Sequence, residues 1–479
     1  MNSGVVRLGL MALILTGPFA PVAGQAPSGR EVVESLTYEP LDFSAEAPDE
    51  YAVQGVPVLV LAQHDLPLVS IYARFRGGYS TWGRQFYGVG TGLPAQLRYG
   101  GTVDMPADSV DELLEYYALQ TSFGGSGEVV SSTINSLTEY VPRALDLWGD
   151  MLIRPRFDED QIAVWRGREL ESVRRRLDDP SRLAFSEFNR LLYGDHPIGW
   201  EMTEDDLAES RLTRDRFHEL HRRVVCRENL ILGVTGDVQW DTLRPVLDRF
   251  VAKLAPCEGD MPESPIPDIR REPGVYVIEK DLEQSVIVMA HPTTVRLADD
   301  PIYFAATIGN SILGAGGFSS RILSRVRTEE GFAYSASSLW TMPRRYDGII
   351  GALTRTRPEN TVPAIRVILD AMAELKDEAP ATEEVETAVE RIVNGFVFNF
   401  ETAGQIVSRT MFYMAIDLPQ DWLQRYLAGV QGVTAESVHR VMQSQLRPDD
   451  MMILIVGDPD RIGRDALEAL GPITVLEVR

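Results

Sequence analysis

The sequence lacks the excess of positive charge that nucleic acids and anionic membrane surfaces attract. It contains 46 lysine and arginine residues against 70 aspartate and glutamate residues, which gives a formal net charge of -24 at pH 7. We therefore expect no nucleic acid and no anionic membrane among its partners. The negative charge indicates ordinary solubility, and a hydrophobic content of 44% is typical of a globular protein.

Long hydrophobic runs are missing from all but the first residues of the chain. Arg7 precedes the short apolar run Leu8–Gly17, and the small residues Val22–Gly24 resemble a cleavage site. Such a run is too short to span a bilayer and is typical of a secretory signal peptide. The sequence thus predicts a signal peptide over residues 1–24 and an exported chain, periplasmic or secreted, without a membrane span after its removal.

Cysteine is scarce, with Cys226 and Cys257 as the two residues of this type. Cys226 precedes an expected strand over residues 229–235, and Cys257 follows the helix that comes after this strand. Both cysteines would then lie at the same end of a strand–helix unit. This placement allows a disulfide in an exported protein, and two unpaired thiols are the alternative.

Histidine is scarce too, with six residues in the chain. His218 and His221 lack the H-E-x-x-H spacing of a zinc protease helix, so we interpret them as surface or packing histidines. The turn Gly314–Gly317 lacks the lysine of a phosphate-binding loop and indicates a tight turn. Asp237 and Asp458 each follow an expected strand and are predicted to cap the helix that comes next.

An internal repeat organises the chain, which at 479 residues is too long for one hydrophobic core. The segment Thr213–Asp237 aligns without a gap with Thr434–Asp458, at an offset of 221 residues. Helix, turn and strand coincide throughout the two segments. A repeat of this length predicts two copies of one domain.

The domain boundaries follow from the repeat and from the segment between its copies. Pro256–Pro273 is rich in proline and poor in apolar residues, which is typical of an extended linker. We expect a signal peptide over 1–24, an N-terminal domain over 25–255, the linker over 256–273 and a C-terminal domain over 274–479. Alternating and helical patterns occur in both halves, so the expected fold class is α+β.

The stretch Gly316–Ser335, GGFSSRILSRVRTEEGFAYS, combines a glycine turn with a short helix and the start of a strand. Ser320 is predicted to cap the helix by accepting backbone N–H bonds, and Gly331 is placed where the helix would stop. Arg327 near the helix end and Tyr334 on the following strand are seven residues apart.

Two interpretations of this arginine and tyrosine are open from the residues alone. Arg327 could pair with Glu329 or Glu330, while Tyr334 could be a half-buried strand aromatic. Alternatively, a guanidinium and a phenol can both donate hydrogen bonds to a peptide carbonyl or to the oxyanion that it becomes.

Together, the repeat, the linker and this stretch resemble the pitrilysin/insulinase metallopeptidase family, which includes mitochondrial processing peptidase and bacterial relatives. The resemblance covers nearly all of the chain after the signal peptide. It implies two homologous α+β domains, each an antiparallel sheet packed with helices, in an architecture that closes like a clam around an unfolded peptide. It also implies that Arg327 and Tyr334 bind substrate near the scissile carbonyl.

Family members that cleave peptides carry the motif H-x-x-E-H on a helix of the first domain. Its two histidines bind zinc and its glutamate is the general base. This chain has GTGLPAQLRYGGT at the corresponding position, with Gly92, Ala95 and Gln96 in place of the first histidine, the glutamate and the second histidine. The resemblance therefore implies that this chain binds no zinc and that the zinc is held by a partner subunit.

Two further residues of the motif region bear on this conclusion. Glu171 falls at the spacing of the third zinc ligand, but it cannot hold zinc alone, and a pair with Arg175 on the helix surface explains it. Pro94 lies within the zinc-helix segment, so that helix is predicted to be altered as well.

The predicted function is that of a non-catalytic subunit of a heterodimeric, exported zinc metallopeptidase. This chain would supply part of the chamber wall and the Arg327–Tyr334 pair, and a homologous zinc-bearing subunit would cut. Peptides would be held extended by adding a strand to a sheet edge, and the net charge favours basic peptides. The alternatives are a peptide-binding or chaperone-like protein without a cutting partner, and an autonomous hydrolase with a different site.

Overall fold

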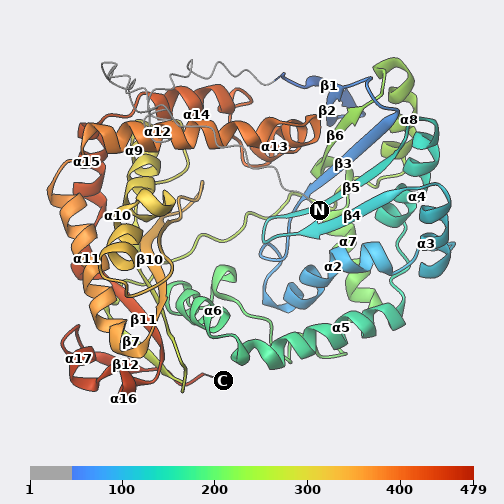
Figure 1. Cartoon of the computed structure of the whole chain (residues 1–479). Coiled ribbons are helices and arrows are strands. Elements are labelled where there is room, and N and C mark those ends of the chain that lie inside the picture. The colour runs from blue at the N-terminus through green and yellow to red at the C-terminus, as the bar shows by residue number, and fades with distance from the viewer. Residues whose placement is uncertain (1–45, 479) are drawn as a thin grey trace, which may run out of the picture. The chain divides into compact units, whose positions relative to one another are not determined.

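The computed structural model describes residues 46–478 (Figure 1). The predicted signal peptide lies outside these residues. Two six-stranded sheets, one in each half of the sequence, organise the fold. In the first sheet, the strands Leu68–Arg76 and Val129–Leu137 alternate between buried and less buried residues. In the second sheet, the strands Ser285–Thr293 and Met452–Gly457 are buried throughout, and helices pack on both sheets.

The first sheet has the strand order β1-β2-β6-β3-β5-β4. Its strands are β1 (Asp49–Val53), β2 (Val56–Ala62), β3 (Leu68–Arg76), β4 (Gln120–Gly125), β5 (Val129–Leu137) and β6 (Leu230–Gly236). The helices of this half are α2 (Tyr87–Tyr99), α3 (Ala107–Tyr116), α4 (Val141–Ile153), α5 (Glu159–Arg174), α6 (Pro180–Tyr193), α7 (Arg214–Val224) and α8 (Trp240–Ala252).

The second sheet has the strand order β12-β7-β11-β8-β10-β9. Its strands are β7 (Gly274–Glu279), β8 (Ser285–Thr293), β9 (Ala336–Trp340), β10 (Gly348–Thr356), β11 (Met452–Gly457) and β12 (Ile473–Val475). The helices of this half are α9 (Pro301–Asn310), α10 (Arg321–Leu323), α11 (Thr361–Asp377), α12 (Thr382–Val397), α13 (Ala403–Ala415), α14 (Trp422–Gln431), α15 (Ala435–Gln445), α16 (Pro459–Ile462) and α17 (Arg464–Glu468).

The two sheets have the same core topology, which confirms the α+β fold class and its duplication. In each half the last long strand, β6 or β11, inserts between the first two core strands. Because those two strands run in opposite directions, the inserted strand is antiparallel to one and parallel to the other. The sheets are therefore largely antiparallel, with parallel pairs at β2–β6, β7–β11 and β7–β12.

The repeated segments begin with equivalent helix caps. The hydroxyl of Thr213 accepts the backbone N–H of Arg216, and the hydroxyl of Thr434 accepts the N–H of Ser437. These caps satisfy backbone donors that the first helical turn leaves unpaired. The strands of the two segments, β6 and β11, end at Gly236 and Gly457. These glycines are 221 residues apart, as the offset of the repeat predicts.

The two aspartates after these strands differ from each other. Asp458 accepts the N–H groups of Asp460 and Arg461 and caps α16, so its predicted role is confirmed. The prediction for Asp237 is wrong. Its carboxylate pairs with the Nδ1 of His64 at 2.8 Å and accepts the hydroxyl of Thr138 at 3.1 Å, because α8 begins only at Trp240.

The two halves exchange one helix each (Figure 1). Helix α6 of the N-terminal half packs on β8 and β11 of the second sheet, and α13 of the C-terminal half packs on β6, β2 and β3 of the first sheet. The two helices occupy nearly equivalent positions in the repeat. Each sheet thus depends on the other half for the helix on one of its faces.

A glycine allows α13 to approach the first sheet closely. A Cβ atom at Gly233 of β6 would lie 2.4 Å from Val407 Cγ1 and 2.6 Å from Met411 Sδ. These distances are far below van der Waals contact, so a larger residue would displace the helix. The repeat places Leu454, a fully buried residue that contacts α6, at the equivalent position of β11.

The segment between α8 and β7 contains no helix or strand, as expected of the linker over 256–273. The domain limits at 255 and 274 remain a prediction. The two cysteines form a disulfide, with a Cα–Cα distance of 5.0 Å. It joins Cys226, which precedes β6, to Cys257, which follows α8, so the first of the two alternatives holds.

Candidate functional site

The positions of the zinc motif lie on helix α2. Gly92 is buried, and a Cβ atom built on it would come within 2.8 Å of the Trp165 ring of α5. The indole therefore fills the space into which a histidine at this position would project. No local signal in the sequence identifies Trp165, because it comes from a different helix.

The other two positions offer no metal ligand and no base. Gln96 is 1% exposed, and its amide nitrogen donates to the carbonyl oxygen of Gln161 at 3.4 Å. Ala95 is half-buried and apolar. Among residues 46–478, no three His, Cys, Asp or Glu side chains are grouped so that they could hold a metal ion. The residues present at these positions do not fit zinc.

Glu171 and Pro94 have different outcomes. Glu171 accepts the Nε–H of Arg175 at 2.6 Å on the exposed surface of α5, which confirms the helix-surface pair. The predicted alteration of the zinc-motif helix is wrong, because α2 runs without a break from Tyr87 to Tyr99 with Pro94 in its interior. The proline ring packs against Gly125 of β4, where a Cβ atom would lie 2.9 Å from the ring, and this contact holds the helix against the sheet.

The stretch around Arg327 has an unusual backbone. A π-helical turn, Ser311–Ala315, precedes the glycine turn, and a second one, Ser324–Glu329, continues α10 and contains Arg327. Gly331 has a φ of 66°, so it ends the helix as predicted. Turns of this type are rare and occur frequently at functional sites.

Arg327 contacts two exposed aromatic rings. Its Cζ atom lies 4.5 Å from the ring centroid of Tyr334 and 4.7 Å from that of Phe318. Tyr334 is 80% exposed and Phe318 is 73% exposed. Cation–π contacts at these distances orient the guanidinium and leave its N–H edge free to donate. The structure brings the predicted pair together and adds Phe318, which the sequence signals only as an apolar residue next to a glycine turn.

Neither packing interpretation of the pair describes the structure. Within the described residues Arg327 forms no ion pair with Glu329 or Glu330, and Glu329 instead accepts the hydroxyl of Ser324 at 3.4 Å. Tyr334 lies before β9 and not on a strand, and its ring is exposed. That Arg327 and Tyr334 bind substrate remains a prediction.

The helical part of this stretch is tied to its neighbours by an ion-pair network. Arg321 donates to Glu384 at 3.0 and 2.8 Å and to Glu374 at 3.3 Å, and Arg325 also pairs with Glu374. The hydrogen bond from Arg321 lowers the pKa of Glu384, so this carboxylate stays ionised. The network fixes α10 against α11 and α12.

The predicted cap of this helix is absent. The hydroxyl of Ser320 donates to the carbonyl oxygen of Gly317 at 2.6 Å and makes no cap hydrogen bond to the helix. It is buried against the glycine turn, so it stabilises the turn that carries Phe318.

A pocket of about 400 Å³ adjoins Tyr334 where β8 begins and β10 ends. Strand β9, the last in the sheet order, lies just after Tyr334 and has no strand on its outer side among the described residues. The hydroxyls of Thr354 and Thr356 donate to the carbonyl oxygens of Ser335 and Phe332 and hold this segment beside β10. A free strand edge close to a half-buried arginine and an exposed tyrosine can bind an extended peptide.

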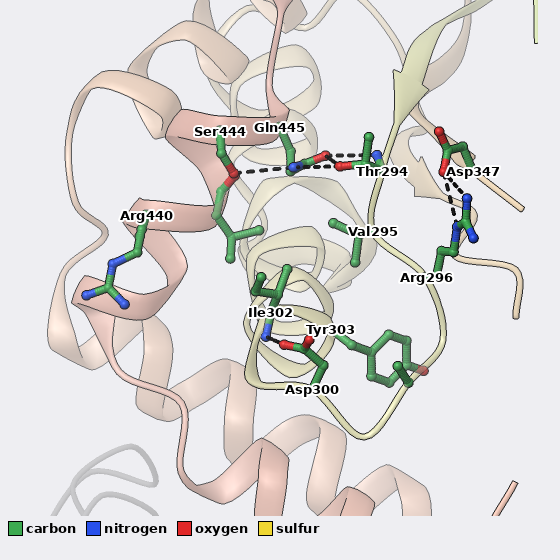
Figure 2. Close-up of a pocket in the computed structure, with 12 residues that line it drawn as sticks. Thr294, Val295, Arg296, Asp300, Ile302, Tyr303, Asp347, Arg440, Ser444 and Gln445 are labelled. Carbon is green, nitrogen blue, oxygen red and sulfur yellow. Dashed lines mark hydrogen bonds and ion pairs between the residues drawn. The ribbon is translucent and has the colours of Figure 1, made fainter.

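The pocket of Figure 2, about 700 Å³, has a different character. Gln445 accepts from the backbone N–H of Thr294 at 3.0 Å, and Arg296 pairs with Asp347 at 2.8 Å. Its polar side chains are thus engaged with one another, and none of these pairs involves a residue of the Arg327 site. We assign no ligand to it.

Comparisons with known proteins agree with this picture. The family model of the peptidase M16 inactive domain matches residues 211–392. The non-peptidase homolog YmxG of Helicobacter pylori is 22% identical over 87% of this chain and 95% of its own length. The crystal structure of a peptidase M16 inactive domain from Pseudomonas fluorescens superimposes with a TM-score of 0.74 at 23% identity, covering 86% of this chain and 98% of that one.

A fourth comparison concerns the cell compartment. The periplasmic protease PqqL of Escherichia coli superimposes with a TM-score of 0.74 at 11% identity, over 92% of this chain and 49% of the PqqL chain. At such identities the structural matches establish the fold alone. Within residues 46–478, no helix is both long and apolar enough to span a bilayer.

Proposed function

We propose that this chain, which is similar to the peptidase M16 inactive domain and whose zinc-motif positions hold no metal ligand, is the non-catalytic subunit of a heterodimeric zinc metallopeptidase. The partner would be a homologous chain that keeps the H-x-x-E-H motif and supplies zinc and the general base. This chain would bind the peptide and form part of the wall around it.

The observation that carries the proposal is the half-buried Arg327, which lies against two exposed aromatic rings between a glycine turn and an edge strand. Its guanidinium contacts Phe318 and Tyr334 and forms no ion pair within the described residues. An arginine held in this way can donate to a substrate carbonyl, and it can stabilise the oxyanion that forms when a partner's zinc-bound water attacks. A purely structural arginine would be expected to pair with one of the neighbouring glutamates.

Trp165 supports the absence of zinc chemistry from this chain itself. A histidine at Gly92 would collide with the indole, so the loss of the motif is built into the packing of α2 against α5. Substituting the three motif residues would therefore not restore a zinc site. The position of Trp165 does not affect Arg327 and Tyr334, which lie in the other half of the chain.

We also propose that the chain is exported. The predicted signal peptide, the disulfide between Cys226 and Cys257 and the periplasmic location stated for PqqL support this placement.

A reconstitution experiment tests the proposed function. The purified chain is mixed with a zinc-bearing homologous subunit, and cleavage of an unfolded polypeptide is measured for each subunit and for the mixture. Activity is expected only in the mixture. Arg327→Ala should lower kcat/KM by about a hundredfold, the loss typical of one oxyanion donor, and Tyr334→Phe should lower it by less.

The matched control is Arg440→Ala, which removes an exposed arginine that pairs with Glu436 on α15. It should leave cleavage unchanged. Zinc-dependent cleavage by this chain alone would overturn the proposal. Peptide binding that depends on Arg327, without any cleavage in the mixture, would instead identify a peptide-binding or chaperone-like protein.

A further inference from the structure

A third pocket lies between strand β3 and the exchanged helix α13. Its volume is about 380 Å³. The residues that line it come from β3, from α13 and from the turn before α13: Arg74, Asn399, Gln405, Ser408, Arg409 and Phe412. It shares no lining residue with the pocket beside Tyr334.

Helix α13 presents one face to this pocket. Gln405, Ser408, Arg409 and Phe412 recur at intervals of three and four residues, which places them on one side of a helix. The opposite side is apolar and packs on Gly233. The helix therefore covers the sheet with one face and offers a polar face with an aromatic residue to the pocket.

Within residues 46–478, two arginines of this pocket have no carboxylate partner, and they indicate the kind of ligand. The side chain of Arg74 is half-buried, and within the described residues its one contact of note is with the ring of Phe412, at 5.8 Å. Burial lowers the pKa of Arg74, which reflects the cost of removing this cation from water. Arg409 donates to the Oδ1 of Asn399 at 2.7 Å, and Asn399 carries no charge that would balance it.

Buried or half-buried cations are normally balanced by an acidic group, because an unpaired charge costs free energy when it leaves water. Here two guanidinium groups line one small pocket in a protein with a net charge of -24. A ligand with a carboxylate would supply the missing charge and could accept hydrogen bonds from both arginines.

The other half of the repeat shows that the fold does not require this arrangement. Strand pairing with β6 and β11 aligns Ser70, Tyr72 and Arg74 of β3 with Val286, Val288 and Ala290 of β8. The three residues of β8 are buried against α6. At this strand, the covered sheet face is thus apolar and closed in the second half but polar and half-buried in the first.

We infer that the pocket between β3 and α13 binds a carboxylate of the captured peptide, so that the protein prefers acidic segments. Arg74 and Arg409 would pair with the carboxylate, and Phe412 would cover the aliphatic part of the side chain. This inference rests on the proposed function, because it presumes that a peptide is bound. It is opposite to the preference for basic peptides that the net charge suggests.

Peptide binding to the full exported chain tests the inference. Fluorescence anisotropy compares a blocked neutral peptide that has one central glutamate with the same peptide that has glutamine. A third peptide has the glutamine and a free C-terminal carboxylate, and this arm distinguishes a side-chain carboxylate from the chain end. The glutamate peptide should bind about tenfold or more tightly than the glutamine peptide, with a difference that shrinks at high salt.

Arg74→Met and Arg409→Met should each remove this preference, whereas Arg440→Met, the control, should keep it. If Arg74→Met folds poorly, Arg74→Lys replaces it in the test. This variant keeps the positive charge and should keep part of the preference for the glutamate peptide. Equal affinity for all three peptides, or a preference that survives both methionine variants, would overturn the inference.

The test separates this inference from the proposed function. Equal peptide affinities together with Arg327-dependent cleavage would overturn the carboxylate pocket alone. A charge preference without any cleavage in the mixture would overturn the subunit proposal and leave the pocket in place. If no peptide binds, both fail.

Discussion

The two sheets share the order of their five core strands but differ on the face that the exchanged helix covers. Under α6, the second sheet presents Val286, Val288 and Ala290, all buried. Under α13, the first sheet presents Ser70, Tyr72 and Arg74, all half-buried. Since the backbone positions are equivalent, the difference lies in the side chains and not in the topology.

We propose from this difference that one copy of the repeat serves stability and that the other keeps a polar surface for a ligand. An apolar face closed by a helix contributes free energy through burial. A polar, half-buried face contributes less free energy through burial. Removing the Arg74 cation from water also costs free energy. We infer that the first sheet tolerates this desolvation free energy because a bound ligand offsets it.

Removing a large side chain from the apolar face should have the largest effect. Phe188 of α6 is 2% exposed and packs on the second sheet. Phe188→Ala should lower the free energy of unfolding by about 3–5 kcal/mol, because it removes buried apolar area and leaves a cavity. Urea denaturation followed by circular dichroism measures the change.

Phe185 of the same helix is the control, because its side chain is 39% exposed. Phe185→Ala should change the free energy of unfolding by less than about 1 kcal/mol. Similar losses for the two variants would mean that α6 does not seal the second sheet as described.

A buried histidine gives the first half an acid sensitivity at a position that is apolar in the second half. The second half has its own buried histidine elsewhere, His291, whose pKa desolvation also lowers. His221 is buried, and desolvation lowers its pKa from 6.5 to about 4, although its ring bonds to the carbonyl oxygen of Leu152. The repeat places Met442, also buried, at the equivalent position. A group with a depressed pKa in the folded state is protonated first in the unfolded state.

This contribution to stability is therefore complete above about pH 6.5 and is lost as the pH falls toward 4. The expected loss is roughly 3 kcal/mol. Urea denaturation at a series of pH values measures it. His221→Met, which copies the second half, should flatten the pH dependence between these limits even if it lowers stability at pH 7. An unchanged slope would contradict the assignment.

The smallest effect on stability is expected on the polar face. Arg74→Leu removes a half-buried cation that has no carboxylate partner within the described residues. The free energy of unfolding should stay within about 1 kcal/mol of the wild type or increase, since no ion pair is lost. A loss above about 2 kcal/mol would show that Arg74 supports packing, and the contrast between the two faces would then weaken.

Much of the fold could be predicted from the sequence because it is encoded locally. The caps at Thr213 and Thr434, the strand ends at Gly236 and Gly457 and the helix end at Gly331 follow from residue type and spacing. One prediction from local sequence was wrong. Asp237 has the sequence context of the helix cap Asp458, but it pairs with His64, which is far away in the chain.

The candidate site divides in the same way. The loss of zinc ligands at Gly92, Ala95 and Gln96 and the choice of Arg327 and Tyr334 needed no coordinates. The contact of Phe318 with Arg327 and the position of Trp165 over Gly92 required the structure, because each joins segments that no sequence period connects.

The sequence by itself determined that the chain is a duplicated α+β protein without a zinc motif, since repeats, caps and ligand identities are properties of neighbouring residues. The exchange of α6 and α13 between the halves, and the placement of Arg74 of β3 rather than an apolar residue beneath α13, are visible only in the folded protein. The physical reason is that a helix pattern shows which side of the helix is apolar but not which sheet it will cover. That choice depends on complementary surfaces, such as Gly233 beneath Val407, that lie far apart in the chain.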